Sequence, residues 1–478
     1  MPDSSLNLII ERITQDTREV EDGALFICIK GFQTNGHDVA QEAVDNGATA
    51  IIASEPITVS VPVVYVKDTM KAMAIIADIF YDSPSKKMKM IGVTGTNGKT
   101  TTTLLLDQIF RDHKESTGVI GTMYRRVVDK VYETKNTTPD IITTQRTLNK
   151  MVKSEVTFCS MEVSSHSLVQ GRVWGLDFDV AIFTNLSQDH LEYHHTMQAY
   201  AEAKSLLFSQ LGNGYNHQSQ KLAVINVDDP YGRSYFEKIA APVITYGMNR
   251  PADFKAENLL IEKNGTAFTL LFQEEKYDVK LNLVGKFNVM NALAAIAGAY
   301  AAGRPLEDII QSLERVEGVR GRFELVPTET NFSIIVDYAH TPDGLENVLK
   351  AANEIKVNNV ISVVGCGGDR DPSKRSIMAD VSINNSDISI FTSDNPRTED
   401  PDTILDEMTR HLNQNQFIRL TDRREAINKA VQLAESGDVI LIAGKGHEDY
   451  QIIGTTKHHF DDVEEAQAAV REIKNKSN

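Results

Sequence analysis

Apolar runs rich in β-branched residues alternate with amphipathic stretches along most of the chain. Short runs bounded by glycine, proline or polar residues predict strands, and the stretches between them predict helices. The predicted strands lie at 24–29, 50–53, 63–66, 157–163, 179–184, 221–226, 333–337, 360–365, 388–392 and 438–443. Strands that alternate with helices are typical of an α/β fold with mainly parallel sheets.

Two further elements complete this pattern. A hairpin is predicted between residues 259 and 283, and a helix from about 288 to 302. Glycine or polar residues follow the strands of the last third of the chain. Because ligands of open α/β sheets gather at the carboxyl ends of the strands, we expect functional side chains there.

The chain has 478 residues, which is too long for one ordinary core and predicts about three domains. The polar segments 82–87 and 317–322 have the composition of linkers. We therefore predict domains at 1–87, 88–318 and 319–478.

Composition narrows the classes of protein further. Hydrophobic residues make up 41% and charged residues 24%, and no apolar run approaches the length of a membrane helix. The first residues do not resemble a secretory signal, so a cytoplasmic protein without membrane insertion is expected. The three cysteines, Cys28, Cys159 and Cys366, are widely spaced and are expected to be buried thiols.

The formal net charge of −17 opposes broad binding to nucleic acid or to an anionic membrane. A locally basic pocket is still compatible with this charge. Any anionic ligand must therefore be held by particular residues.

The segment 95–100 reads Gly-Thr-Asn-Gly-Lys-Thr between a predicted strand and a predicted helix. Gly95 and Gly98 let the backbone turn with its N–H groups inward, Lys99 supplies a point charge, and the Thr100 hydroxyl can hold Mg²⁺. The common phosphate-loop spacing would place a glycine where Val93 stands. Polyphosphate binding is predicted, and the alternative is a turn that merely joins strand to helix.

Two polar side chains follow neighbouring predicted strands and are candidates for magnesium. Glu162 suits Mg²⁺, which prefers oxygen ligands, whereas His190 would be a less usual ligand. The alternative for Glu162 is a solvated acid at the end of a strand. His194 and His195 match no zinc spacing, so we expect them at the surface or in supporting roles.

Eight segments together resemble the Mur ligases of peptidoglycan synthesis. They are 95–100, 136–139, 162–166, 189–190, 203–208, 285–291, 321–324 and 337–342, in the family's order. The resemblance implies an α/β protein of three domains, with a central phosphate-loop ATPase domain and a C-terminal Rossmann-like domain. Within the family, the segments 162–166, 394–397 and 444–448 resemble the members that add the third residue of the stem peptide.

The resemblance implies an ATP-dependent amide ligase in peptidoglycan synthesis, and so a role in cell wall biogenesis, cell shape and cell division. ATP would phosphorylate the terminal carboxylate of UDP-N-acetylmuramoyl-L-alanyl-D-glutamate, and the amine of meso-diaminopimelate would displace phosphate. A carboxylate is a poor electrophile, and phosphoryl transfer needs charge compensation, which Lys99 and Mg²⁺ would supply. The implied catalytic residues are Lys99, His190 and Lys204. The implied metal ligands are Thr100, Glu162, His190 and Lys204.

Lys204 matches the lysine that the family carries as a carbamate, and the alternative is an ordinary salt-bridging lysine. The implied ATP site comprises Gly95, Thr96, Asn97, Gly98, Lys99, Thr100, Thr101, Asn288, Arg322 and Asp337. Of these, Asn288 would lie near the adenine, Arg322 near the phosphates and Asp337 near the ribose. Their alternatives are a helix cap, a linker salt bridge and a turn at a strand end.

For the UDP-sugar, the resemblance implies Thr17, Asn136, Thr137, Thr138, Ser164, Gln170 and Arg172. The first domain would bind this substrate. Thr17 stands where the family has serine, which keeps the hydroxyl, and Ser167 stands where the family has glycine.

For the amino acid, the resemblance implies Arg370, Asp394, Asn395, Pro396, Arg397, Gly444 and Glu448, most of them in the C-terminal domain's strand-end segments. Meso-diaminopimelate carries a distal carboxylate that L-lysine lacks, and an arginine fork binds a carboxylate best. Arg397 is therefore the expected specificity determinant, unless it pairs with Glu399 or Asp400.

Other functions remain open at this point. They are a ligase that adds L-lysine or another diamino acid, another amide ligase such as a folylpolyglutamate synthetase, and a non-catalytic nucleotide-binding protein. The segments 162–166 and 394–397 argue against another amide ligase. A monomer without nucleic-acid partners is expected.

Overall fold

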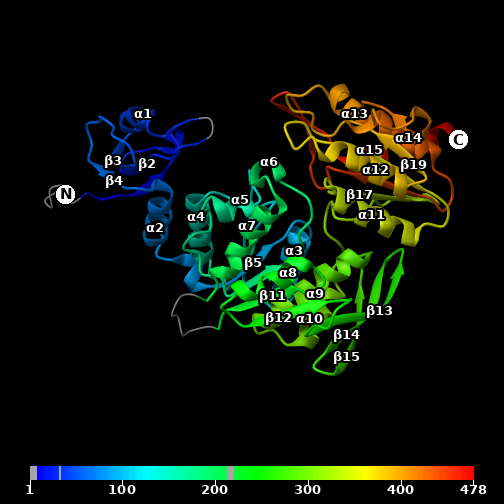
Figure 1. Cartoon of the computed structure of the whole chain (residues 1–478), viewed down its shortest axis with the longest axis horizontal. Helices are drawn as coiled ribbons and strands as arrows, with labels where there is room; N and C mark the ends of the chain where they lie inside the picture. The colour runs from blue at the N-terminus through cyan, green and yellow to red at the C-terminus, as the bar shows by residue number, and fades with distance from the viewer. Residues whose placement is uncertain (1–7, 32–33, 213–219, 478) are drawn as a thin grey trace. The chain divides into compact units, whose positions relative to one another are not determined.

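The computed structural model describes residues 8–31, 34–212 and 220–477. The chain divides into two compact units, Met1–Gly92 with Lys114–Asp179, and Val93–His113 with Val180–Asn478. Figure 1 follows the chain from the N-terminus in blue to the C-terminus in red. Each unit is built from α/β layers, as the sequence pattern predicts.

The first unit begins with a parallel four-stranded sheet. The strands, in sheet order, are β1 (Arg12–Thr14), β2 (Ala24–Ile27), β3 (Ala48–Ala53) and β4 (Val63–Tyr65). The associated helices are η1 (Thr17–Glu19, 3₁₀), α1 (Ala40–Asp45) and α2 (Thr69–Phe80). The Asp68 side chain caps α2 by accepting from the Lys71 N–H at 3.0 Å, and Met73 of α2 packs on Ile13 and Leu25.

The same unit contains a second group of strands. In it β6 (Thr117–Ile120) pairs in parallel with β9 (Phe158–Glu162) and antiparallel with β7 (Arg125–Val127), which pairs with β8 (Lys130–Tyr132). Helices α4 (Ile141–Lys153) and α5 (Ser165–Val169) belong here. The expected linker contains a 3₁₀ helix, η2 (Pro84–Lys87), whose buried Ser85 hydroxyl accepts from the Asp177 N–H.

The strand β5 (Lys89–Thr94) leads into the second unit, where α3 (Lys99–Asp112) packs against α9 (Lys286–Ala301). The parallel strands are β10 (Val180–Phe183), β11 (Leu222–Asn226) and β12 (Val243–Gly247). The helices between them are α6 (Leu191–His194), α7 (Met197–Ser209), α8 (Pro230–Ser234) and η3 (Phe236–Lys238), and α10 (Leu306–Leu313) follows α9.

The predicted hairpin at 259–283 is wrong in extent. Three strands occupy this region, β13 (Phe254–Glu262), β14 (Gly265–Phe272) and β15 (Glu275–Leu281), and they form an antiparallel meander. Along β14, buried and half-buried residues alternate, as expected of a strand with one face on a core. The two-residue turns Lys263-Asn264 and Gln273-Glu274 separate the strands. The first is followed by Gly265 and so carries an Asn-Gly turn signal, whereas the second carries none.

The last part of the chain forms a six-stranded sheet. Its order is β16 (Glu324–Leu325), β17 (Ser333–Asp337), β21 (Val439–Ala443), β18 (Val360–Val364), β19 (Ile388–Phe391) and β20 (Ile418–Arg419), and only β16 is antiparallel. Its helices are α11 (Pro342–Ile355), α12 (Lys374–Asn385), α13 (Pro401–Thr409), α14 (Arg423–Leu433) and α15 (Asp462–Ser477), with η4 (Gln414–Gln416). A hairpin of β22 (Tyr450–Ile453) and β23 (Thr456–His459) precedes α15.

Alternate residues of these strands face two separate cores. On β21, Leu441 belongs to the core that contains residues of α11, α12 and α13, whereas Ile442 belongs to the core that contains residues of α14 and α15. The sheet is therefore covered on both faces, as in doubly wound folds. Its carboxyl ends lead into Tyr338, Ser393 and Gly444, where polar site residues were expected.

Two expectations from composition can be checked here. Cys28, Cys159 and Cys366 are free and buried, as predicted. None of the helices within the described ranges combines the length and hydropathy that a membrane crossing requires.

Candidate functional site

The phosphate loop lies between the end of β5 and the start of α3, as predicted. Gly95 and Gly98 have φ values of +154° and +85°, which side chains other than glycine rarely adopt. A Cβ on Gly95 would collide with the Thr184 hydroxyl, and one on Gly98 would collide with the Asn291 amide. Both glycines are therefore required by space as well as by conformation.

Asn185 and Thr184, just after β10, fix the loop. The Thr96 N–H donates to the Asn185 backbone carbonyl and the Asn97 N–H to its side-chain oxygen, both at 2.9 Å. The Thr184 hydroxyl donates to the Asn97 carbonyl at 2.6 Å. Lys99 Nζ lies along the same loop and donates to the Gly95 and Thr96 carbonyls at 2.9 and 2.8 Å. The end of β10 thus holds the loop in place, and Lys99 keeps its ammonium against the loop backbone.

Lys204 on α7 reaches the same loop. Its side chain is only 1% exposed, its Nζ donates to the Gly95 carbonyl at 2.8 Å, and it lies 4.5 Å from the Tyr200 ring centroid. Burial, and next the charge of Lys99, lower the pKa of Lys204 well below its usual value. The alternative of an ordinary salt-bridging lysine is wrong, because no carboxylate pairs with Nζ among the described residues.

Asp189 and His190 follow the loop's supporting strand. His190 Nε2 lies 3.3 Å from Asp189 Oδ2, and its φ is +55°. Burial alone would raise the pKa of Asp189, but the charges of His190, His340, Lys374 and Lys99 lower it to about 2. Asp189 is therefore an anion that faces cations from both the loop and the C-terminal sheet.

His194 is buried, with 7% of its surface exposed, and stacks on Tyr200 with 5.1 Å between centroids. A surface role is therefore wrong for His194, and a supporting role fits its contacts. Burial lowers the pKa of His194 to about 4, so the ring is neutral at pH 7. Within the described ranges, no group of three or more His, Cys, Asp or Glu side chains could hold a metal ion by itself.

Arg322 brings the C-terminal sheet's entry segment to the phosphate loop. Its Nη2 donates to the Thr100 hydroxyl at 3.0 Å, and its guanidinium lies 4.6 Å from the Tyr338 ring centroid. The Arg322 Nε is buried and has no hydrogen-bond partner among the described residues. Within the part of the chain that the structure describes, Arg322 forms no salt bridge, so this alternative is wrong.

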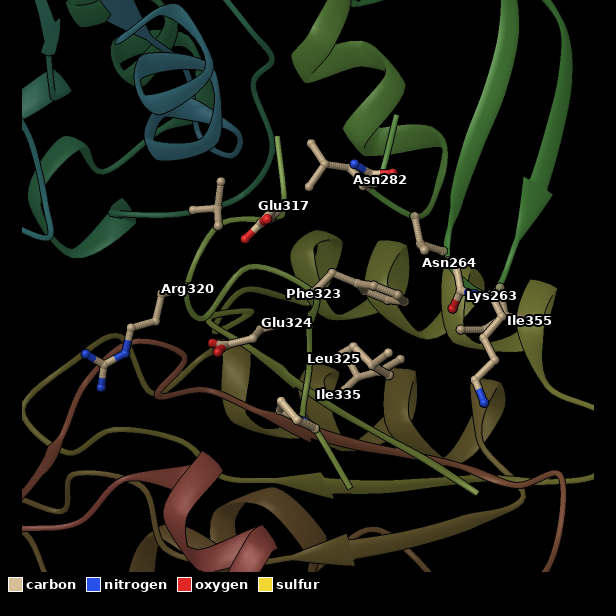
Figure 2. Close-up of a pocket in the computed structure, with 15 residues that line it drawn as sticks. Lys263, Asn264, Asn282, Glu317, Arg320, Phe323, Glu324, Leu325, Ile335 and Ile355 are labelled. Atoms are coloured by element: carbon tan, nitrogen blue, oxygen red, sulfur yellow. The ribbon is translucent and has the colours of Figure 1, made fainter. Parts of the chain in front are cut away.

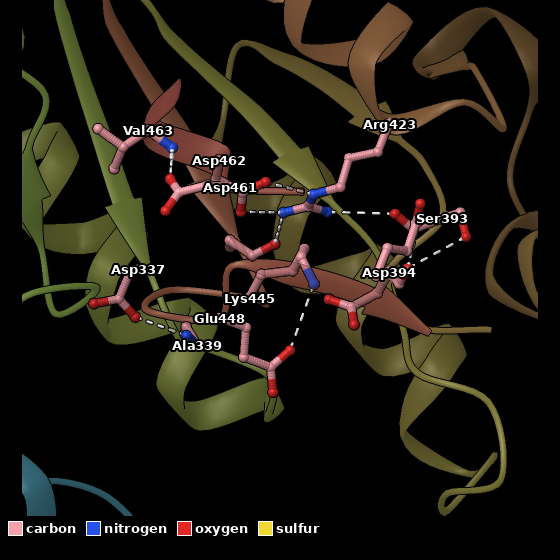
Figure 3. Close-up of polar contacts among 12 residues, drawn as sticks. Asp337, Ala339, Ser393, Asp394, Arg423, Lys445, Glu448, Asp461, Asp462 and Val463 are labelled. Carbon is pink, nitrogen blue, oxygen red and sulfur yellow. Dashed lines mark hydrogen bonds and ion pairs between the residues drawn. The ribbon is translucent and has the colours of Figure 1, made fainter. Parts of the chain in front are cut away.

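For Asp337 the structural alternative is observed, whereas for Asn288 it is not. Asp337 Oδ2 accepts from the Phe323 N–H and Oδ1 from the Ala339 N–H, both at 2.7 Å, so it does hold a turn at the end of β17 (Figure 3). Burial raises the pKa of Asp337 to about 6, although the Arg322 charge and these N–H groups oppose the shift. Asn288 Nδ2 donates to the Val284 carbonyl at 2.9 Å and does not cap α9.

In the first unit, Glu162 is buried at the end of β9 rather than solvated. It is 1% exposed, and its two oxygens accept from the Thr122 N–H at 2.8 Å and the Thr122 hydroxyl at 2.9 Å. The Thr122 hydroxyl oxygen also lies 3.1 Å from that of Thr137, from which it can accept. Thr138 joins this group through hydrogen bonds to the backbone. The Thr138 hydroxyl donates to the Glu162 carbonyl and accepts from the Ser164 N–H.

The predicted sugar-binding residues of the first unit lie partly together. Arg172 Nη1 donates to the Thr138 carbonyl at 2.9 Å, and Nη2 donates to Gln170 Oε1. Asn136 is exposed, and its carbonyl accepts from the Thr134 hydroxyl. Thr17 lies in η1 beside the other sheet, where its carbonyl accepts from Asn46 Nδ2 at 3.0 Å.

Two arginines lie together beyond β18 and β19. Arg397 Nη1 donates to the Gly368 carbonyl at 2.7 Å, and Arg370 Nη1 donates to the Asp369 carbonyl at 3.0 Å. Burial, then the charge of Arg397, lower the pKa of Arg370. Glu399 is paired with Arg375 at 2.9 Å, so the expected alternative pairing of Arg397 with Glu399 is not formed. The two cations thus lie close enough to repel each other, and neither forms an ion pair with a carboxylate among the described residues.

Carboxylates gather a short distance along the same edge. Asn395 Nδ2 donates to Glu448 Oε2 at 2.8 Å, and the buried Lys445 Nζ lies 3.5 Å from that oxygen and donates to the Tyr450 carbonyl (Figure 3). A Cβ on Gly444 would collide with the Asp394 carboxylate, so the two segments are in close contact. Burial, and next Asp394, raise the pKa of Glu448.

Several contacting residues were not anticipated from the sequence. They are Thr184, Asn185, Tyr200, Asp343 and Lys445. Asn185 could have been found, because it is a polar residue directly after the predicted strand 179–184, and ligands gather at the carboxyl ends of strands. Asp343, whose Oδ2 accepts from Asn97 Nδ2 at 2.9 Å, gives no such signal.

A cavity of about 470 Å³ lies beside the segment 317–325 (Figure 2). Its lining combines charged side chains such as Lys263, Arg320 and Glu324 with apolar ones such as Phe323 and Ile335. None of the predicted site residues lines it. The candidate site therefore remains the phosphate loop together with the carboxyl edge of the C-terminal sheet.

These features are typical of an α/β protein with a phosphate loop, and arginines and carboxylates gather at the carboxyl edge of its C-terminal sheet. Three family models match the chain: the Mur ligase family catalytic domain at residues 9–81, the Mur ligase middle domain at 93–299 and the Mur ligase glutamate ligase domain at 321–446. The chain belongs to the Mur ligase family and is an enzyme of the ligase class, which confirms the resemblance and the three-domain architecture.

The chain is also similar in sequence to individual named ligases. The chain is 54% identical over 96% of its length to a protein of Lactiplantibacillus plantarum named UDP-N-acetylmuramoyl-L-alanyl-D-glutamate–2,6-diaminopimelate ligase, with 94% of that protein covered. A protein of the same name from Bacillus cereus is 50% identical, with 96% and 94% covered.

Solved structures of Mur ligases are also similar to this chain. One with that title is 34% identical, covers 97% of this chain and 95% of its own, and has a TM-score of 0.69. A MurF ligase from Thermotoga maritima in complex with ADP is 18% identical, with 99% and 100% covered and a TM-score of 0.69, which shows the shared fold.

Proposed function

We propose that this chain is the ATP-dependent ligase that joins meso-diaminopimelate to UDP-N-acetylmuramoyl-L-alanyl-D-glutamate in peptidoglycan precursor synthesis. The observation that carries the proposal is that one compact unit holds both a phosphate loop and a cluster of opposite charges, with Arg397 and Arg370 near Asp394 and Glu448. Relatives that carry this activity in their names at 50–54% identity support it.

ATP binds along residues 95–101, where the backbone N–H groups and Lys99 hold its phosphates. The buried, unpartnered Nε of Arg322, beside Thr100, is a donor that lacks an acceptor and suits a phosphate oxygen. Asn288 contacts the adenine and Asp337 the ribose in this proposal. The γ-phosphoryl group passes to the terminal carboxylate of the D-glutamate, which forms an acyl phosphate and releases ADP.

Mg²⁺ fits the donors that this chain offers. Thr100 supplies a hydroxyl oxygen and Glu162 a buried carboxylate, both hard ligands, and phosphate oxygens and water complete such a site without a protein cage. We assign Thr100, Glu162, His190 and Lys204 as its ligands. When bound, the ion neutralises phosphate charge during transfer.

Lys204 is proposed to carry a carbamate. Carbamylation needs a neutral amine, and the burial that lowers the pKa of Lys204 provides one. A carbamate nitrogen keeps one N–H, so the donation to the Gly95 carbonyl can persist. The modification places an anion beside the Lys99 ammonium, which adds an attraction inside the site.

The UDP-sugar dipeptide is assigned to the domain at 1–87 and to the polar cluster of the first unit, with residues Thr17, Asn136, Thr137, Thr138, Ser164, Gln170 and Arg172. Hydroxyl and amide groups suit the hydroxyl and carbonyl groups of such a ligand. The remaining proposed boundaries are 88–318 for the ATP-binding domain and 319–478 for the amino-acid-binding domain.

Meso-diaminopimelate carries an ammonium and a carboxylate at its distal end. Arg397 and Arg370 receive the carboxylate, whereas Asp394, Asn395 and Glu448 receive the ammonium, with Pro396 and Gly444 shaping the pocket. The other amine, once deprotonated, attacks the acyl carbon, the C–N bond forms, and phosphate leaves with the C–O electron pair. L-lysine has no distal carboxylate, so the exposed Arg370 and the half-buried Arg397 would lack this charged partner.

The protein is further proposed to act as a monomer in the cytoplasm, without nucleic acid. The test of the function is phosphate release from ATP with UDP-N-acetylmuramoyl-L-alanyl-D-glutamate and meso-diaminopimelate, L-lysine or neither. Turnover with diaminopimelate alone is expected. Turnover with L-lysine would keep the ligase and overturn the role of Arg397, and no turnover with either would overturn the proposed substrates.

A further inference from the structure

An ion pair with no access to solvent lies behind the proposed amino-acid pocket. Arg423 and Asp462 are the first residues of α14 and α15, and both side chains are 0% exposed. The guanidinium is bidentate, with Nε 2.8 Å from Asp462 Oδ1 and Nη2 2.7 Å from Oδ2 (Figure 3). Burying such a pair does not by itself stabilise a fold, because desolvation offsets the attraction.

The same guanidinium also holds the ends of two strands. Arg423 Nη2 donates to the carbonyl of Ala443, the last residue of β21, at 3.0 Å, and Nη1 donates to the carbonyl of Ser393, just after β19, at 3.5 Å. These strands do not pair with each other, because β18 lies between them in the sheet. Arg423 is therefore a direct link between their carboxyl ends.

The two linked carbonyls immediately precede the segments of the pocket. Asp394 follows Ser393, and Gly444 follows Ala443. The segments they begin contact each other through Asn395 Nδ2 and Glu448 Oε2 at 2.8 Å. Any change in the separation of the two strand ends would move Asp394 and Arg397 relative to Glu448.

We propose that Arg423 and Asp462 are a positioning pair that fixes the separation of segments 394–397 and 444–448 and thereby sets the affinity for the amino acid. This inference rests on the proposed function, which assigns the amino acid to these segments. Neither residue lines the pocket, and Asp462 acts by orienting the guanidinium so that its remaining N–H groups face the carbonyls.

The chain offers a matched control on the same two helices. The next residue of α14, Arg424, forms a bidentate pair with Glu465 of α15, with both distances 2.7 Å. This pair is 61% and 14% exposed and contacts no strand end among the described residues. Replacing it tests the loss of an ion pair between α14 and α15 without the loss of the link.

The experiment compares Arg423→Met/Asp462→Leu with Arg424→Met/Glu465→Met in the full-length enzyme. We expect the first variant to raise KM for diaminopimelate by about tenfold or more, with KM for ATP unchanged, and the second to change neither. Arg423→Lys, which keeps the charge without the fork, should fall between them. If the double variant does not fold, Arg423→Lys alone provides the comparison with the control. An equal rise in both KM values, or the same rise in the control, would overturn the proposal.

Amide hydrogen exchange without any ligand separates this inference from the proposed function. Faster exchange in 394–397 and 444–448, with α9 unchanged, is expected for Arg423→Met/Asp462→Leu and not for the control. Unchanged exchange in these segments would refute the positioning role. If the unmodified enzyme gave no turnover with diaminopimelate, the proposed substrate would fail, and the exchange result would still decide whether the pair fixes the two segments.

Discussion

Lys99 is the residue on which the proposed phosphoryl transfer depends most. Its ammonium follows the loop 95–100, where it would compensate the charge of the transferring group. Lys99→Ala should lower kcat by at least about 10²-fold in the phosphate-release assay. The control is Lys350→Ala, which removes an exposed lysine paired with Glu346 on α11. Near-normal turnover of Lys99→Ala would refute the phosphate-loop assignment.

Arg397 decides between diaminopimelate and L-lysine in the proposed pocket. Arg397→Ala should raise KM for diaminopimelate, because losing one partner of a buried charge pair typically costs roughly 2–5 kcal/mol. Initial rates with each amino acid measure the change in preference. Arg419→Ala removes an exposed arginine that pairs with Asp402 and Asp406, and it should leave the preference unchanged. If Arg397→Ala still prefers diaminopimelate to the same degree, Arg397 is not the determinant.

Asp337 predicts a measurable pH dependence of stability. Burial raises the pKa of this carboxyl from 3.8 to about 6, so its contribution to folding is fully present below pH 3.8 and is lost as pH rises through about 6. Asp337→Asn does not titrate. The free energy of unfolding of Asp337→Asn relative to the unmodified protein should therefore rise by roughly 3 kcal/mol between pH 3.8 and 7.

Urea unfolding at several pH values in this range measures that difference. The lost hydrogen bond to Phe323 or Ala339 adds an offset that does not vary with pH, so only the slope bears on the pKa. A difference that stays constant across the range would show that Asp337 has an ordinary pKa in the folded protein.

Single residues were predictable from the sequence where spacing along the chain constrains them. Gly95, Gly98, Lys99 and Thr100 lie within six positions, and the structure places them in one loop. Asp343 contacts Asn97 from 246 positions away, and nothing in the local sequence of either residue indicates that contact. Burial is equally hidden, since Glu162 and His194 are polar residues whose enclosure depends on distant elements.

At the scale of elements, α11 is attached to the phosphate loop by its first turn. Asp343 Oδ2 accepts from Asn97 Nδ2 at 2.9 Å, beside the N-terminus of α3. Asp343→Ala should weaken binding of a non-hydrolysable ATP analogue about fivefold, as expected for about 1 kcal/mol of one net hydrogen bond. Calorimetric titration measures this.

The matched control for that variant is Glu346→Ala on the same helix, which removes an exposed carboxylate paired with Lys350. It should leave nucleotide affinity unchanged. Equal affinities in Asp343→Ala and the unmodified protein would mean that the contact with α11 does not support the loop when nucleotide is bound.

Most strands with strong β-branched runs were predicted within a few residues of their observed bounds, because burial on both faces imposes an apolar run. The strands β6 and β12 have such residues and were not predicted. The short elements β16, β20 and α6 were not predicted. Each has two to four residues and owes its conformation to neighbours rather than to its own sequence. The meander β13–β15 was underestimated because its half-exposed strands include charged residues such as Lys280 and Glu257, which weaken the apolar signal.

For the whole molecule, composition and linker signals divide the chain into consecutive blocks, whereas contacts divide it differently. The segment Val93–His113 belongs to the second unit, and the segment Lys114–Asp179 that follows it belongs to the first. A linear reading of the sequence cannot produce this exchange, because it arises from pairing between strands far apart in the chain. The proposed boundaries at 87 and 318 therefore describe the order of the sequence, and the two units describe its packing.

This division predicts separate footprints for the two large substrates. The UDP-sugar dipeptide is assigned to residues of the first unit and ATP to residues of the second. Added alone, the dipeptide should slow amide exchange mainly in 134–140 and 162–172, and an ATP analogue with Mg²⁺ should slow it in 95–103 and 319–323. Lys99→Ala should lose the nucleotide footprint and keep that of the dipeptide. A dipeptide footprint confined to the second unit would refute the assignment of Thr138, Ser164 and Arg172, because a bound ligand protects the amides that it contacts.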